Sequence, residues 1–196
     1  YITGDDANTL ENNPQLEIFK NKGIEVLLLT DPIDEFWTQT LASYKDFAIK
    51  HIASADFDMK AARDEEKGKK EDIDALVTFM GEIFKGEVSK VEETDRLTKS
   101  PAALSVEKGQ MSIHLERLMR SHQQQTTFAS NRILEINPYH KLIIKMAEAL
   151  HDDANKQKVA DVARILLDQA KIAEGECVSD ASFFNEKLSE YILRAF

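Results

Sequence analysis

The sequence contains a single cysteine, Cys177, among its 196 residues. An internal disulfide is therefore excluded, and a zinc site built from several cysteines lacks its ligands. This sparing use of cysteine is typical of proteins in a reducing compartment, so we expect a cytoplasmic protein.

Long apolar runs and an excess of positive charge are also missing. The longest apolar candidate, Ile24 to Leu29, is interrupted by Glu25 and is far shorter than the roughly 20 residues of a membrane helix. The chain has 35 acidic and 25 basic residues, a formal net charge of -10. Such a charge repels nucleic-acid phosphates and anionic lipids, so we expect neither nucleic acid nor membrane as a partner.

Sequence patterns of catalysis are missing as well. There is no Gly-rich phosphate loop, nucleophile elbow or zinc motif, and the five histidines have no metal-like spacing to carboxylates or Cys177. The acids Asp31, Asp34 and Glu35 stand at an expected helix start, where such residues cap the helix and favour its dipole. A small metal- or acid-dependent hydrolase built on this acidic cluster is an alternative.

What is present begins with a strand–helix–strand pattern. A strand-like start at Tyr1 and the apolar run 24–29 flank a helix-length stretch, 7–20, which predicts a βαβ unit. We expect 24–29 to be a strand buried on both faces, followed by a helix that starts near Pro32. The start lacks an initiator Met and a signal peptide, so we expect a fragment of a longer protein.

The second half is predicted to be richer in helices. A charged stretch, 57–70, is interpreted as a linker between a first unit, 1–56, and a second domain, 71–196. In the second domain we expect helices at 73–84, from Ser112, from Asn137-Pro138, at 153–174 and after Ser179-Asp180, and strands at 88–97, 102–106 and 132–136. The predicted class is α+β: a βαβ remnant, then a helix-rich domain with a small, mostly antiparallel three-stranded sheet and three C-terminal helices.

Five segments, in the same order, resemble the ninety-kilodalton heat-shock chaperone family. They are residues 23–35, Arg96-Leu97 with Ser100-Pro101-Ala102, residues 111–119, residues 133–143, and Leu166-Leu167-Asp168-Gln169-Ala170. The sequence as far as Phe196 lacks the acidic Glu-Glu-Val-Asp tail of eukaryotic cytosolic members, so the resemblance is to the bacterial HtpG type. It identifies residues 1–56 as the end of a middle domain and 71–196 as a C-terminal dimerisation domain.

The resemblance implies a molecular chaperone that forms a homodimer and binds unfolded or partly folded clients. The family binds ATP and magnesium in an N-terminal domain that this chain does not contain. The chain alone is therefore expected to have no catalytic residue and no cofactor, whereas the whole protein is expected to hydrolyse ATP. A stand-alone dimeric scaffold that binds one defined partner is the alternative.

Two helix patterns near the end of the chain predict the dimer contact. The helix at 153–174 has apolar residues on two flanks, and the terminal helix has one apolar stripe, which either completes its own core or meets a second chain. Two such helices from each chain would form a two-fold, four-helix interface. The predicted interface residues are Val159, Val162, Ala163, Leu166, Leu167, Phe184, Leu188, Tyr191 and Ile192.

A further apolar stripe predicts the client surface. Four residues at spacings of four, three and one fall on one side of a helix: Met111, Leu115, Leu118 and Met119. The pattern alone favours a core helix, whereas the resemblance favours client contact, for which the flexible Met side chain is well suited. Phe36 and Trp37 would extend this surface, although one of the two must face inward.

Overall fold

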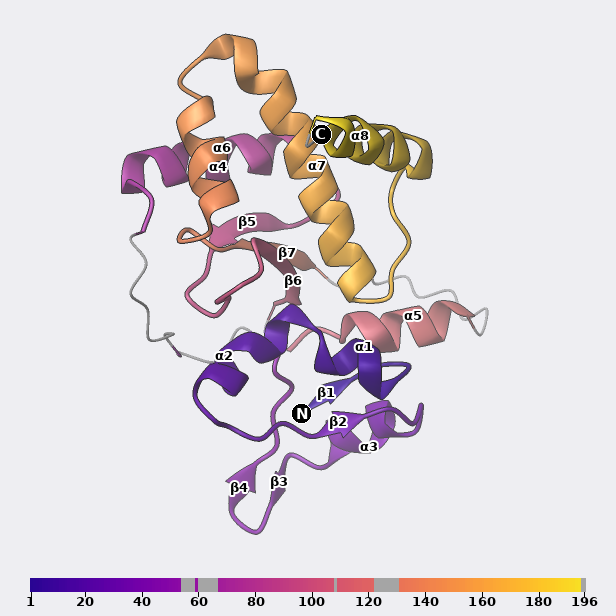
Figure 1. Ribbon diagram of the computed structural model, residues 1–196. Helices are drawn as coiled ribbons and strands as arrows, with labels where there is room; N and C mark the ends of the chain where they lie inside the picture. Colours follow the sequence, from indigo (N-terminus) through magenta and orange to yellow (C-terminus); the bar gives the residue numbers. More distant parts are fainter. Residues whose placement is uncertain (54–58, 60–66, 108, 122–130, 195–196) are drawn as a thin grey trace.

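The computed structural model describes residues 1–53, 59, 67–107, 109–121 and 131–194 (Figure 1). The α-helices are α1 (Ala7–Glu11), α2 (Glu17–Asn21), α3 (Asp34–Thr40), α4 (Lys70–Ile83), α5 (Ile113–Ser121), α6 (Lys141–Ala149), α7 (Lys156–Ala173) and α8 (Ala181–Leu193), with 3-10 turns η1 (Pro14–Leu16) and η2 (Asp153–Asn155). The strands are β1 (Ile2–Thr3), β2 (Leu28–Leu29), β3 (Ser43–Tyr44), β4 (Phe47–Ala48), β5 (Lys90–Glu93), β6 (Ala102–Val106) and β7 (Arg132–Ile136). The predicted α+β class is confirmed.

The N-terminal part, residues 1–53, contains the predicted βαβ unit in a short form. Strands β1 and β2 pair in parallel, with Ile2 opposite Leu28, and α1, η1 and α2 connect them. The prediction that 24–29 is one strand buried on both faces is wrong, because Ile24 is 44% and Leu27 64% exposed. Only Leu28 and Leu29 pair with β1, and the Leu27 carbonyl oxygen accepts from the Ile2 N–H at 3.0 Å. Among the described residues, 24–26 have no strand partner.

The three-stranded sheet has the order β5-β7-β6. β6 and β7 are antiparallel, with Ala103 opposite Glu135, whereas β5 and β7 are parallel, with Val91 opposite Leu134. The prediction of a mostly antiparallel sheet is therefore wrong for one of the two pairings. The physical reason is the route of the chain, which passes through β6 and α5 before β7 and so returns in the direction of β5.

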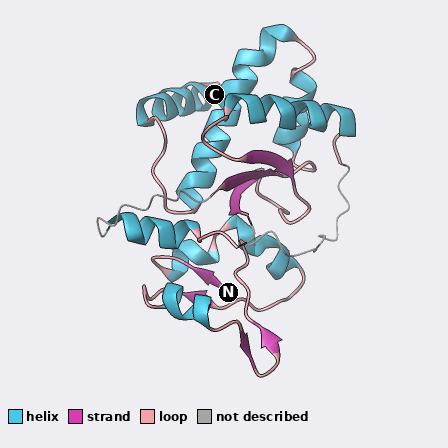
Figure 2. Ribbon diagram, turned by 180° about the vertical axis from the view of Figure 1, so that it is seen from behind, coloured by secondary structure: helices cyan, strands magenta, loops and turns pink. Residues whose placement is uncertain are grey.

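Alternation along β6 and β7 separates the two faces of this sheet. Leu104, Leu134 and Ile136 belong to the main core, which α4, α6 and α7 cover on one side of the sheet (Figure 1). Ser105 and Glu135 have the opposite parity and are also buried. The N-terminal part lies on that other side, as Figure 2 shows from behind. None of the helices in the described ranges is long and apolar enough to cross a membrane.

Polar contacts attach the N-terminal part to the sheet domain. The Glu17 carboxylate accepts hydrogen bonds from three consecutive backbone N–H groups, at 2.5 Å from Thr98, 2.7 Å from Lys99 and 3.0 Å from Ser100. The Gln15 amide donates to the carbonyl oxygen of Leu104 at 2.5 Å, on the outer edge of β6. The N-terminal part thus covers a strand edge that would otherwise be open.

Two helix starts show how local hydrogen bonds set the boundaries. The predicted helix start at Asn137-Pro138 is wrong by about one turn, because His140 caps α6 and accepts from the Leu142 N–H at 3.1 Å. Asn137 instead holds the preceding turn, accepting from the Tyr139 N–H at 3.1 Å. Helix α8 starts as predicted, with Asp180 as its cap.

The buried apolar residues of the described chain form two groups. The smaller group lies within the N-terminal part: Ile2, Leu10, Leu16, Ile18, Phe19 and Ile52. The larger one surrounds the three-stranded sheet. The predicted linker, 57–70, falls largely on residues 57, 58 and 60–66, which lie outside the described residues. The boundaries 1–56 and 71–196 therefore stay a prediction.

Candidate interaction surfaces

Helix α7 contributes most of its apolar side chains to the core of its own chain. Val159, Ala163, Leu166 and Leu167 are each at most 3% exposed, and Val162 is half-buried against the same core. A side chain enclosed in its own chain has little surface left for a partner. This placement corrects the expected interface, because the four buried residues pack inside their own chain. The dimer contact stays a prediction, and its remaining candidate residues lie mainly on α8.

Helix α8 is covered on one side only. It has no buried residue. Three of its predicted interface residues are half-buried: Phe184, Leu188 and Tyr191. Ile192 is 52% and the neighbouring Leu193 75% exposed. The helix packs on α7, where the Lys187 ammonium lies 2.9 Å from the Asp161 carboxylate. The end of α8 therefore presents apolar side chains to solvent.

Helix α5 has one buried side and one partly open side. Leu115 is buried together with Ile113, which belongs to the main core. The expected client surface therefore loses Leu115, because the helix turns this part of its stripe towards the body of the chain. Met111, Leu118 and Met119 are half-buried and keep accessible surface.

Helix α3 divides its two aromatic residues between solvent and protein. Phe36 is 57% exposed, whereas Trp37 is half-buried and donates from Nε1 to the Asp34 carboxylate at 2.7 Å. Asp31 accepts from the Ile33 N–H at 3.2 Å, so these acids order the helix start. Within the described ranges, no group of three or more His, Cys, Asp or Glu side chains could hold a metal ion.

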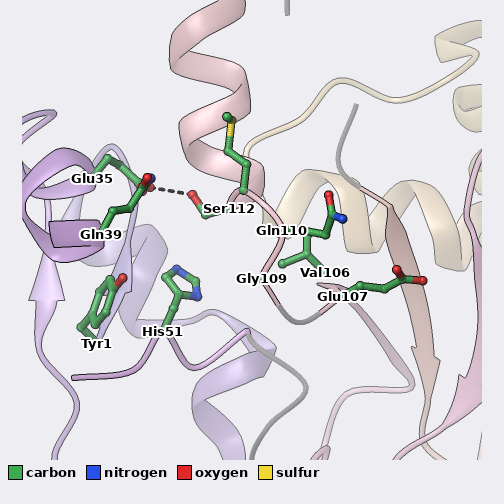
Figure 3. Close-up of a pocket in the computed structure, with 10 residues that line it drawn as sticks. Tyr1, Glu35, Gln39, His51, Val106, Glu107, Gly109, Gln110 and Ser112 are labelled. Carbon is green, nitrogen blue, oxygen red and sulfur yellow. Dashed lines mark hydrogen bonds between the residues drawn. The ribbon is translucent and has the colours of Figure 1, made fainter. Parts of the chain in front are cut away.

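A hollow of about 430 Å³ separates α3 from the segment that leads into α5 (Figure 3). Glu35 bridges it: one carboxylate oxygen accepts from the Ser112 hydroxyl at 2.9 Å and from the Thr3 hydroxyl at 2.5 Å. Met111 also lines the hollow. Two of the predicted client segments, α3 and the start of α5, are thus brought to one place.

Sequence reasoning missed the residues that form this hollow. They are Tyr1, Glu35, Gln39, His51, Val106, Glu107, Gly109, Gln110, Met111 and Ser112, of which only Met111 was singled out as a binding residue. They come from separate stretches of the chain, and no periodicity joins them. Only the tertiary fold brings them together.

His51 lies in the wall of the hollow in a neutral state. Its Nδ1 accepts a hydrogen bond from the Ala53 N–H at 3.1 Å, which requires an unprotonated nitrogen. The pKa of His51 is lowered to about 3, and burial is the largest cause of this shift. The fold therefore favours the neutral imidazole over the cation.

We expect acidification to destabilise the chain through His51. The pKa of His51 is 6.5 in the unfolded chain and about 3 in the fold. The stability it contributes is complete above pH 6.5 and is lost as the pH falls towards 3. Between pH 7 and pH 5 this residue should remove about 2 kcal/mol from the free energy of unfolding. Urea titrations at both pH values would show a smaller loss in His51→Gln and the full loss in His151→Gln, an exposed control. Equal losses in all three chains would contradict this assignment.

Comparisons with known proteins match the whole chain. The family model described as Hsp90 protein matches residues 1–196. The chain is 43% identical to the chaperone protein HtpG of Paramagnetospirillum magneticum over 95% of its length, and 40% identical to that of Rhodospirillum rubrum over 97%. It is 34% identical to that of Ehrlichia canis over 100% of its length. The chain spans about a third of the length of these relatives, 31% to 32%.

Proposed function

Because the chain belongs to the Hsp90 protein family, we propose that it is the part of a bacterial HtpG-type molecular chaperone that forms the homodimer and part of the client surface. The observation that carries this proposal is the uncovered apolar end of α8. Ile192 is 52% and Leu193 75% exposed, and contiguous exposed apolar surface often marks a site of protein–protein interaction.

The proposed dimer pairs α7 and α8 of one chain with the same helices of a second chain. A two-fold interface is self-complementary, so each exposed apolar residue on α8 is used twice. The half-buried residues Phe184, Leu188 and Tyr191 become fully buried in such a contact. Val162 is the predicted α7 interface residue that keeps accessible surface, and it joins them in the proposed contact. A lasting dimer of this kind buries roughly 1,500 Å² or more.

The proposed client surface joins α3 and α5. Phe36 is exposed on α3, and Met111, Leu118 and Met119 are partly exposed on α5. Methionine adapts its shape to different apolar partners, which suits a surface for unrelated unfolded proteins. The hollow beside Met111 supplies concave space between the two helices.

The remaining functions belong to the proposal for the whole protein. The relatives are about three times longer than this chain, and their printed name is chaperone protein HtpG. We propose that ATP and magnesium are bound, and ATP hydrolysed, by parts of the whole protein outside this chain. A cytoplasmic location is part of the same proposal.

We expect Phe36→Ser to weaken the suppression of aggregation. The change removes an exposed aromatic side chain from the client surface without disturbing a core contact. The chain concentration needed for half-maximal suppression of a thermally unfolding test protein should rise about five-fold, the effect of losing roughly 1 kcal/mol of apolar contact. Light scattering measures this concentration. The matched control is Ile24→Ser, at an exposed apolar residue that precedes β2 in the sequence, which should behave as the parent does.

The same assay separates the chaperone from a scaffold with one defined partner. Suppressed aggregation of several unrelated test proteins supports the chaperone. An unchanged aggregation rate for all of them, with Phe36→Ser indistinguishable from the parent, would exclude α3 as a client surface and favour the scaffold.

A further inference from the structure

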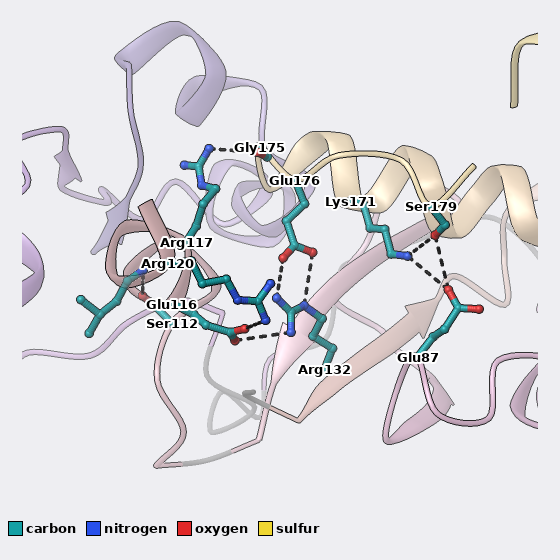
Figure 4. Close-up of polar contacts among 11 residues, drawn as sticks. Glu87, Ser112, Glu116, Arg117, Arg120, Arg132, Lys171, Gly175, Glu176 and Ser179 are labelled. Atoms are coloured by element: carbon teal, nitrogen blue, oxygen red, sulfur yellow. Dashed lines mark hydrogen bonds and ion pairs between the residues drawn. The ribbon is translucent and has the colours of Figure 1, made fainter. Parts of the chain in front are cut away.

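The loop 174–180, which joins α7 to α8, is tied to α5 through two arginines, the first of which is Arg132. Arg132 on β7 lies between two carboxylates: Nη1 is 3.4 Å from Glu116 on α5, and Nε is 3.2 Å from Glu176 in the loop (Figure 4). Arg132 Nη2 forms a second contact with Glu176. Glu116 is fully buried and Arg132 largely so. Because little water screens these buried charges, each is stabilised mainly by the oppositely charged side chain beside it.

Arg117 forms a second tie between α5 and the same loop. Its Nη1 donates to the carbonyl oxygen of Gly175 at 2.9 Å, and its Nη2 lies 2.7 Å from the Asp5 carboxylate. Gly175 follows the end of α7 with a φ of 72°, and a Cβ atom there would overlap the Arg117 guanidinium. The guanidinium also lies at the negative end of the α7 dipole, a favourable place for a cation.

The other end of the loop is fixed as well. Asp168 is fully buried, and one of its carboxylate oxygens accepts from the Ser179 N–H at 3.0 Å and from the Ser179 hydroxyl at 3.1 Å. Asp180 then caps α8 by accepting from the Phe183 N–H at 3.0 Å. The loop therefore begins at a contact with α5 and ends at the first turn of α8, with both points held.

The charges of this region are matched within the chain. Each cation that lines the hollow beside the loop faces a carboxylate: Arg117 with Asp5, Arg120 with Glu116, Arg132 with Glu116 and Glu176, and Lys171 with Glu87. Such a cluster leaves no excess positive charge for an external anion. Its effect is to hold α5, β7 and the loop in one arrangement.

We propose that the Glu116–Arg132–Glu176 bridge couples client contact at α5 to dimerisation through α8, an inference that rests on the proposed function. A client on the Met111 and Met119 side holds α5 where Glu116 reaches Arg132. Arg132 then keeps Glu176 and the loop in place, and the loop sets the direction of α8. Client binding thereby tightens the dimer, and dimerisation tightens client binding by the same factor.

The test compares dimer dissociation constants with and without a permanently unfolded probe, reduced and carboxymethylated α-lactalbumin. Sedimentation velocity over a concentration series of the full chain measures each constant. We expect the saturating probe to lower the constant about five-fold in the parent and in Glu148→Gln, an exposed glutamate control on α6. In Glu176→Gln, which removes the loop charge, the probe should change it by less than about two-fold.

The possible results distinguish the coupling itself, the proposed function and the route through Arg132. A parent dimer that binds the probe without a change in its constant overturns the coupling and leaves the proposed function standing. A parent chain that neither dimerises nor binds the probe overturns both. A Glu176→Gln chain that keeps the full effect of the probe overturns the route through Arg132.

Hydrogen exchange supplies a readout without any client. In Glu176→Gln the amides of α5 should exchange faster than in the parent, whereas those of α4 should keep their protection and show that the variant is folded. Arg117→Gln, which removes the other tie, should also reduce the effect of the probe. Unchanged α5 exchange in both variants would overturn the proposal.

Discussion

Replacing Arg96 by Met is expected to lower the free energy of unfolding by about 3–5 kcal/mol. Arg96 is 7% and Glu135 2% exposed, and their side chains form an ion pair between the β5–β6 connection and β7. Arg96 also donates to the carbonyl oxygen of Ile52 at 3.1 Å, and Ser105 donates to Glu135 at 2.8 Å. The variant leaves the Glu135 carboxylate buried without its counter-ion. Its other oxygen already has no hydrogen-bond partner among the described residues.

Urea unfolding measures this loss as a lower transition midpoint with an unchanged slope. Adding Glu135→Leu should restore much of the stability, since removing both charges also removes the buried unpaired one. Lys70→Met breaks the exposed Lys70–Asp74 pair and should cost less than about 0.5 kcal/mol. If Arg96→Met costs no more than this control, the buried Arg96–Glu135 pair does not stabilise the fold as argued.

The double change Ile192→Glu with Leu193→Glu is expected to raise the dimer dissociation constant at least about 100-fold. Each apolar side chain contributes about 1.5–3 kcal/mol when buried, and both chains of a symmetric dimer lose it. The new carboxylates would also have to lose water in the contact. Energy transfer between two fluorescently labelled populations, measured at equilibrium over a dilution series, gives the constant.

Folding of the single chain should be unaffected, because both residues point into solvent. An unchanged urea midpoint at low chain concentration checks this. The matched control is Ile24→Glu with Leu27→Glu, which charges two exposed apolar residues of the N-terminal part and should leave the dimer intact. An equal loss of dimer in the control would assign the contact to the wrong end of the chain.

The elements that the sequence predicts best are those with a strong local signal. β6 and β7 have the predicted bounds, because each is a short, mostly apolar run next to a proline-containing turn, Ser100-Pro101 before β6 and Asn137-Pro138 after β7. Helix α8 starts after a side-chain cap, Asp180, that is visible in the sequence. Such signals act over a few residues and do not depend on distant parts of the chain.

Predictions that depend on distant partners were less accurate. The run 24–29 has the composition of a buried strand, yet only Leu28 and Leu29 pair, because a strand forms where a neighbour exists. The α7 residues Leu166 and Leu167 suit a core and an interface equally well by composition. Whether these residues lie in the core or at an interface depends on how the chain packs around the sheet.

The links between segments had no signal in the sequence. Glu35 looked like one of several acids at a helix start, whereas in the fold it joins Thr3 and Ser112 from far along the chain. Glu116 and Glu176 are sixty residues apart in the sequence, and Arg132 forms an ion pair with each of them. Single charged residues have no periodicity, so their partners become visible only in the tertiary structure.

Sedimentation equilibrium of the unmodified chain tests the central claim most directly. We expect the measured mass to approach twice 22.2 kDa at micromolar concentration. Ile192→Glu with Leu193→Glu should return it to 22.2 kDa while the chain stays folded. A parent mass of 22.2 kDa at every concentration would contradict the claim, because the apolar end of α8 would then be a surface without a second chain.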